Sequence, residues 1–182
     1  MKSQTRRFIA YLNILGVKIN STEFESRVKA QKLAYITQKI TNKPLYDFNF
    51  YIKGPYSPEL AKEYFDCRED FENGNSGGYR MLREETEELE RVKPLLNALS
   101  LNDLEIVASL LYIRERGLDE NQAEIRLKEL KPRLKIEDIW KGTNTLKKLL
   151  LTDKLKATIM GSLDKETEEW DSVSNESLQK VE

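Results

Sequence analysis

The residue types that most enzymes use for acid–base and nucleophilic chemistry are scarce in this chain of 182 residues. It contains no histidine, which removes Ser-His and Cys-His catalysis and every metal site that needs an imidazole. Cys67 is the only cysteine, so neither an internal disulfide nor a thiolate metal cluster can form. Its neighbours Glu63, Asp66 and Asp70 should raise the pKa of the thiol, which disfavours a nucleophilic role. We therefore expect a protein that is not an enzyme and uses no cofactor.

Carboxylates and glycines are the remaining candidates for ligand chemistry. Five carboxylates that could offer oxygen ligands to a hard cation are closely spaced: Glu63, Asp66, Glu69, Asp70 and Glu72. They lack the loop spacing of a calcium site, and the pattern favours a solvated helix face. The segment 74–78, GNSGG, lacks the Gly-Lys-Ser/Thr ending of a phosphate-binding loop. We expect a flexible connection there, and no metal site.

The charges are nearly balanced, with 30 Lys and Arg against 31 Asp and Glu. The net charge of −1 gives no general attraction to nucleic acid or to a membrane surface. The apolar runs are shorter than the ~18 residues that a membrane span needs, and the N-terminal segment does not resemble a signal peptide. These features predict a cytoplasmic protein that is not membrane-bound, with nucleic acid an unexpected partner.

The segment 46–60, YDFNFYIKGPYSPEL, is the element that should position the candidate contact residues. Apolar and other residues alternate over 46–53, which predicts a half-buried strand. Gly54 and Pro55 then break the strand, and Ser57 is expected to cap a helix that begins at Pro58. The corner at 54–57 could be an anion site at a helix start, a rigid structural corner or a protein-contact corner.

Three side chains of this segment are candidates for contact with a partner protein: Tyr51, Lys53 and Tyr56. Neighbours along a strand point to opposite faces, so Tyr51 and Lys53 should face away from the core side of Phe50 and Ile52. Tyrosine is favoured at interfaces because it buries much area and loses little rotamer entropy. In the alternative interpretation Tyr56 tucks under the sheet and Tyr51 packs on a neighbouring helix.

The remainder of the chain predicts a mainly α-helical fold of about six to seven helices with a small antiparallel β hairpin, in a single compact domain over 1–152. The expected helices are 4–15, 22–41, 58–72, 84–99, 102–116, 120–130 and 136–151, from apolar residues at three- and four-residue steps. A brief strand at 79–82 is expected to pair with 47–53. Residues 153–182 should form a polar, acidic tail that is partly disordered or a short helix, docking only through Trp170.

Several helix boundaries and inward-facing residues can be predicted from the same patterns. The start signals are a capping box of Thr22 with Glu25, a Ser100–Asp103 cap, and Asp119 with Gln122. Apolar residues almost all round 102–116 predict a central buried helix. The inner faces of three other helices are expected to include Phe24, Phe65 and Trp140, and Gly142 should weaken the middle of the last helix.

Two motifs together resemble a known family. The segment 25–38, ESRVKAQKLAYITQ, resembles the R-x-x-x-Q-K-L-x-Y-x-x-Q helix of YwgA-like proteins, which are relatives of the Panacea domain. It contains Arg27, Gln31, Lys32, Leu33 and Tyr35. The segment 48–60, FNFYIKGPYSPEL, resembles the strand, GPYS corner and helix start of the same family. The resemblance extends over roughly residues 5–150.

This resemblance implies a mostly helical domain with a small antiparallel sheet, which acts by binding other proteins. Panacea-type antitoxins neutralise a toxin, and SocA-type adaptors present a toxin for proteolysis. We therefore expect an antitoxin-like or adaptor-like interaction module with a protein partner, which could be a toxin. For the motif helix, two interpretations stay open. Its polar residues could form a contact surface or support the GPYS corner, or Gln31 could bond buried backbone while Arg27 and Lys32 are solvated.

Two other classes of function remain as alternatives. The first is a DNA-associated regulatory protein, because the first 32 residues are rich in lysine and arginine. The pI near 5.8 and the lack of a clear helix-turn-helix with a basic recognition helix speak against it. The second is a structural protein of the same family.

Overall fold

Eight helices and one two-stranded antiparallel hairpin make up the regular structure of residues 1–151, the part of the chain that this computed structural model describes. The helices are α1 (Ser3–Leu15), α2 (Phe24–Ile40), α3 (Pro58–Asp66), α4 (Arg68–Asn73), α5 (Arg83–Asn97), α6 (Leu101–Arg114), α7 (Glu120–Leu130) and α8 (Ile136–Leu150). The strands are β1 (Asn49–Tyr51) and β2 (Gly54–Tyr56). The expectation of a mainly α fold with a small hairpin is confirmed. The tail expected at 153–182, with Trp170, lies outside the described residues.

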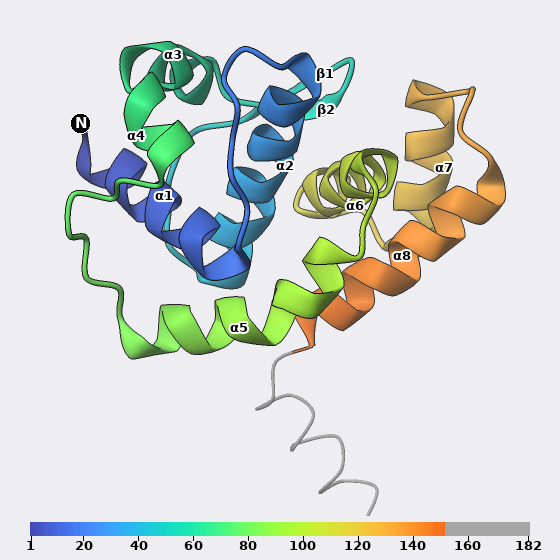
Figure 1. Cartoon of the computed structure of the whole chain (residues 1–182). Helices are drawn as coiled ribbons and strands as arrows, with labels where there is room; N and C mark the ends of the chain where they lie inside the picture. The colour runs from blue at the N-terminus through green and yellow to red at the C-terminus, as the bar shows by residue number, and fades with distance from the viewer. Residues whose placement is uncertain (152–182) are drawn as a thin grey trace, which may run out of the picture. The chain divides into compact units, whose positions relative to one another are not determined.

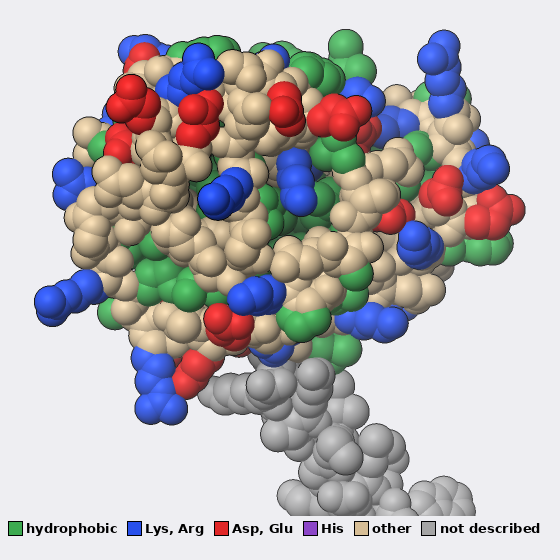
Figure 2. Space-filling model, in the orientation of Figure 1, with side chains coloured by type: hydrophobic (Ala, Val, Ile, Leu, Met, Phe, Trp, Pro, Cys, Tyr) green, Lys and Arg blue, Asp and Glu red, His purple; other side chains and the backbone are tan. Residues whose placement is uncertain are grey.

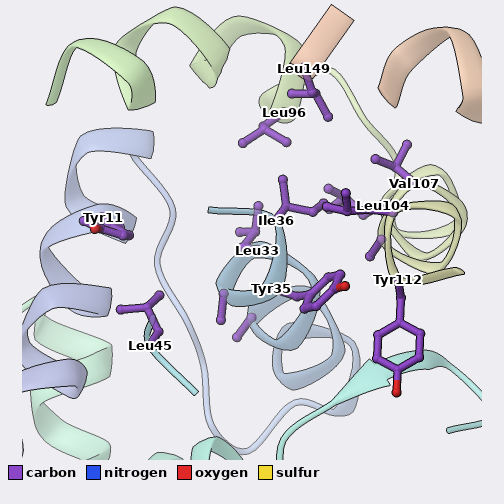
Figure 3. Close-up of a cluster of buried hydrophobic side chains, with 14 of the residues drawn as sticks. Tyr11, Leu33, Tyr35, Ile36, Leu45, Leu96, Leu104, Val107, Tyr112 and Leu149 are labelled. Carbon is purple, nitrogen blue, oxygen red and sulfur yellow. The ribbon is translucent and has the colours of Figure 1, made fainter. Parts of the chain in front are cut away.

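The centre of the fold is the pair α2 and α6 (Figure 1). Helix α2 packs on α6 and also contacts α3, α5 and β2, while α6 contacts α7 and β2 as well. Leu104, Ile106 and Val107 of α6 are fully buried, which confirms a central helix. Figure 3 shows Ile36 and Leu33 of α2 beside Leu104 of α6 in this core.

The ends of several helices follow the predicted capping chemistry. Gly16 ends α1 in the left-handed conformation, with φ 71°. Ser100 caps α6 and Asp119 caps α7, each in a reciprocal box with the residue three positions later. The box expected for Thr22 with Glu25 is wrong, because Glu23 occupies the N-cap position of α2 without a side-chain bond. The Thr22 amide instead donates to Asn20 Oδ1 at 3.0 Å, in a turn before the helix.

Only β1 lies within the segment 46–53 that was predicted to be a strand, and β2 occupies the predicted corner, where no strand was expected. Tyr51 pairs with Gly54 across a two-residue turn of Ile52 and Lys53. The pairing expected between 47–53 and a strand at 79–82 is therefore wrong, and residues 79–82 form no strand. The entropic cost of closing a two-residue turn is small, whereas the other pairing would have to close a loop of more than twenty residues.

The expected helix 58–72 is two helices, because the backbone leaves helical geometry at Cys67 (φ −123°, ψ 36°). Its start is as predicted: Pro58 is the first helical residue and Ser57 Oγ accepts from the Leu60 amide at 3.3 Å.

Three aromatic residues that were expected inside are exposed: Phe24, Phe65 and Trp140. For Trp140 the cause is the orientation of α8, whose Gly142 lies against Ile106 of α6. Two residues along a helix turn the side chain by about 200°, so Trp140 points away from that contact. Leu150, the last residue of the same helix, is also exposed. Over residues 1–151 no helix is both long and apolar enough to span a membrane.

Candidate functional site

The corner that follows the hairpin is hydrogen-bonded directly to the central helix α2. Gln31 Nε2 donates to the Ser57 carbonyl at 3.0 Å, and Gln31 Oε1 accepts from the Ser57 amide at 2.8 Å. The next residue, Lys32, donates from Nζ to the Pro55 carbonyl at 2.7 Å. All these groups are buried. The contact of Gln31 with buried backbone is therefore present, and the motif helix supports the corner.

Lys32 is not solvated, contrary to one expectation, because its side chain lies beneath the hairpin with 1% of its surface exposed. Burial disfavours the charged amine and lowers the pKa of Lys32 to about 7, although nearby Glu105 opposes the shift. Lys53 and Lys131 act in the same direction as burial, through charge repulsion. The fold thus holds a weakly basic amine where a surface lysine was predicted.

Gly54 lets β2 approach α6 closely. Its φ is +82°, and a Cβ at this position would lie 2.4 Å from Ser109 Oγ of α6. Both the left-handed backbone and the lack of space require glycine here. The first residue of the GPYS corner is therefore fixed by packing on α6, and Pro55 and Ser57 by hydrogen bonds to α2.

A groove of about 540 Å³ opens beside this corner, between the start of α2, the hairpin and α3. The apolar part of its lining includes Phe24, Val28, Ile52, Tyr64 and Phe65. In Figure 2 hydrophobic side chains are exposed along the upper edge of the molecule, above α3 and the hairpin of Figure 1. The groove brings exposed apolar side chains together with Gln31 and Lys32, the buried polar residues that hold the corner.

The three predicted contact residues, Tyr51, Lys53 and Tyr56, all line this groove. The rings of Tyr51 and Tyr56 lie against each other, with 5.1 Å between their centroids. Tyr51 is exposed and Tyr56 is partly buried, so neither tyrosine is a core residue. The Lys53 ammonium lies 3.6 Å from a Glu105 carboxylate oxygen and keeps more than half of its side chain in solvent.

The other motif residues divide between the groove and the core. Arg27 lines the groove, donates to the Ser21 carbonyl at 2.8 Å and lies over the Phe24 ring. Leu33 and Tyr35 belong to the core instead, where the Tyr35 ring packs against Tyr112 (Figure 3). Burial raises the pKa of the Tyr35 hydroxyl, which is hydrogen-bonded to a glutamate after α6.

Three groove residues were missed from the sequence as contact candidates: Phe24, Ile52 and Phe65. Ile52 was expected on the core face of a strand, but it occupies the hairpin turn and is 90% exposed. Gly54 is the signal that could have revealed the position of Ile52, because a glycine near the end of an alternating segment also suits a tight hairpin turn. Ile52 and Lys53 would then be the turn residues. Nothing in the periodicity of α3 distinguishes Phe65 from its buried neighbour Tyr64.

Glu63 and Cys67 were among the residues considered for ligand or nucleophilic chemistry, and the structure shows the surroundings of both. Glu63, expected in a solvated face, is buried and accepts hydrogen bonds from Thr5 Oγ1 at 2.6 Å and from Tyr46 at 2.7 Å. Burial, followed by acidic neighbours, raises the pKa of the Cys67 thiol. Within residues 1–151 no three Cys, Asp or Glu side chains gather closely enough to hold a metal ion.

Compared with protein-family models, with curated proteins and with solved structures, the chain gives no significant match. The resemblance to YwgA-like proteins therefore stays a prediction that depends on the two motifs.

Proposed function

We propose that this protein is a non-enzymatic interaction module that binds a segment of a partner protein in the groove beside the hairpin. The observation that carries the proposal is the groove's rim of exposed apolar side chains. Phe24 is 61% exposed, Phe65 is 64% exposed and Ile52 is 90% exposed. Large apolar side chains that gather around a hollow are typical of binding surfaces rather than of ordinary solvated surface.

The rigidity of the corner supports this role. Its backbone is bonded to α2 by both Gln31 and Lys32, and Gly54 fixes its distance from α6. A surface that is ordered before binding loses less conformational entropy when the partner arrives. The groove can therefore bind a segment without first having to fold itself.

Because the two motifs resemble those of YwgA-like and Panacea-related proteins, we propose more specifically an antitoxin-like or adaptor-like module.

The arrangement of the N-terminal cations gives less support to the alternative function, a DNA-associated regulatory protein. Lys2 pairs with Glu59 and Glu63 of α3. Arg7 donates to the Tyr79 hydroxyl at 2.5 Å and lies over its ring. Side chains engaged within the fold are less free to bind phosphates.

The test is recovery of a stoichiometric complex of the full chain from its own cells, compared between two matched variants. Phe65→Ala removes an exposed ring at the groove, and Ile125→Ala removes a side chain of nearly equal exposure, 62%, on α7. We expect Phe65→Ala to weaken the partner's affinity at least about tenfold, because a tenfold change corresponds to ~1.4 kcal/mol and aromatic anchors that become buried contribute this much or more. Ile125→Ala should retain the wild-type affinity.

Equal loss in both variants, or no loss in either, would contradict the proposal. Thermal unfolding of both variants provides the control for folding, and both should unfold within a few degrees of the wild-type protein because the replaced side chains are exposed. Stoichiometric capture of duplex DNA, weakening steeply with salt, would favour the alternative function.

A further inference from the structure

We infer that the groove binds a partner segment in which carboxylate side chains stand among bulky apolar ones. The inference rests on the proposed function and specifies the chemistry of the partner. It follows from the charges that line the groove, from an unpaired hydroxyl in its wall, and from the extent of its apolar rim.

Every charged side chain in the groove lining is basic: Arg27, Lys32 and Lys53. The whole chain carries a net charge of −1, so this lining is a local departure from the overall balance. An acidic segment would be attracted by cations of both α2 and the hairpin turn, whereas a basic segment would be repelled by them. Charge complementarity therefore selects an acidic partner.

The carboxylate nearest to this cluster is already engaged. Glu105 of α6 pairs with Lys131, at the end of α7, and lies 3.6 Å from Lys53. Lys32 is bonded only to a backbone carbonyl among the contacts that the structure shows for its amine. One buried carboxylate thus faces three lysines, and a carboxylate from outside would place a second negative charge beside Lys32 and Lys53.

The wall of the groove also holds an unused donor. Tyr64 lines the groove and is 1% exposed, and its hydroxyl has no hydrogen-bond partner among residues 1–151. An unpaired buried hydroxyl costs free energy, and an oxygen that reached it would recover that cost. A carboxylate offers two such oxygens, so the wall and the lysines favour the same ligand group.

The apolar rim decides in favour of a polypeptide segment over a small free acid. Phe24 stands at the start of α2, Ile52 at the hairpin turn and Phe65 near the end of α3, and all three line the groove with more than half of their surface exposed. A small acid inside the groove would leave these side chains in water. A segment with apolar residues on both sides of its carboxylates would cover them.

The experiment uses random displayed peptides of twelve residues, selected on the full chain and depleted on the Phe65→Ala variant. We expect the retained peptides to be at least twofold enriched in Asp and Glu, together with Leu, Phe or Trp, relative to the starting library. Retained peptides that are neutral or basic would overturn the acidic specificity while leaving the proposed docking role intact. Failure to retain any peptide that distinguishes the two proteins would overturn the inference.

Two matched substitutions then measure the charge contribution for one retained peptide by fluorescence anisotropy. Lys53→Ala removes a groove cation and leaves Glu105 paired with Lys131, whereas Arg83→Ala removes a cationic side chain on α5 that is 90% exposed and ion-paired with Glu87. We expect Lys53→Ala to weaken binding roughly three- to tenfold, and Arg83→Ala to change it less than twofold. Replacing Glu by Gln in the peptide should abolish the difference between Lys53→Ala and wild type. Equal effects of the two substitutions, or tight binding of 4-phenylbutyrate in place of the peptide, would overturn the inference.

Discussion

Lys32 is an amine that the fold has taken out of water, and the pH dependence of stability should report this burial. Its pKa falls from 10.5 to about 7 on folding. Between these values the unfolded chain binds a proton that the folded chain does not bind, so this residue makes stability rise with pH. We expect the free energy of unfolding of wild type, relative to Lys32→Met, to increase from pH 7 to pH 9 by up to ~1.4 kcal/mol per pH unit.

Urea unfolding of both proteins at pH 6, 7, 8 and 9 measures this difference. The comparison cancels other titrating groups, including Lys131, whose pKa is also lowered by burial. Below pH 7 the two curves should run parallel, because Lys32 is then protonated in both states. Parallel curves across the whole range would show that the amine is solvated in the folded protein.

A second prediction at the scale of residues concerns Gly54, which lets β2 approach α6 closely. Gly117 has a similar backbone, with φ +88° against +82°, but open space where its Cβ would stand. We expect Gly117→Ala to cost ~1 kcal/mol for its backbone conformation and Gly54→Ala to cost ~1–3 kcal/mol more for the clash. Chemical denaturation of the two variants gives the comparison.

The clash can be separated from backbone strain by removing its partner atom. In Gly54→Ala combined with Ser109→Ala, the Oγ that lies 2.4 Å from the new Cβ is absent. The combined variant should therefore recover most of the excess over Gly117→Ala. An unchanged cost would mean that backbone conformation alone makes Gly54 necessary.

At the scale of elements, the contact between α6 and α8 depends on a glycine that helix propensity disfavours. A Cβ at Gly142 would lie 2.4 Å from Ile106 Cγ2. We expect Gly142→Ala to destabilise the protein by ~1–3 kcal/mol, although alanine is the better helix former. The control is Asn144→Ala, an exposed position of the same helix, which should be neutral or slightly stabilising. A gain of stability in Gly142→Ala would contradict this close packing.

Helix positions were predictable because their signals are local. The Asp119–Gln122 box and the αL glycine Gly16 act on backbone groups within one turn, and periodicity along α6 reports burial on all sides. The strand expected at 46–53 was too long because the alternation extends into the turn residues Ile52 and Lys53, and β2 was missed because Gly54 and Pro55 were interpreted as a break. The exposed positions of Phe24 and Trp140 depend on how helices rotate against neighbours, and periodicity does not fix that rotation.

For the candidate site, the sequence predicted the segment that contributes to the groove better than it predicted the individual side chains that line it. Tyr51 and Tyr56 were both predicted as contact residues, and the hairpin register brings their rings together in one groove. The burial of Lys32 could not be predicted, because it depends on contacts between α2 and a corner 23 residues later in the chain. The groove itself arises from three elements and has no single sequence signal.

At the scale of the whole molecule, α2 and α6 should be the last elements to open. They form the central pair, and both are buried on more than one side (Figure 1). We expect native-state hydrogen exchange to be slowest in these two helices and much faster in α4, a six-residue helix at the surface. Protection in α4 equal to that of α6 would show that the fold opens only as a unit.

The attachment of the corner to α2 also has a consequence for how this surface can diversify. The residues that fix the groove's shape, Gln31 and Gly54, are committed to folding through hydrogen bonds and close packing. Phe24, Ile52 and Phe65 are exposed hydrocarbon side chains and contribute little to the stability of the fold. Under the proposed binding role, substitutions at the rim would change the partner at small cost to stability, so related proteins could acquire new partners on one unchanged scaffold.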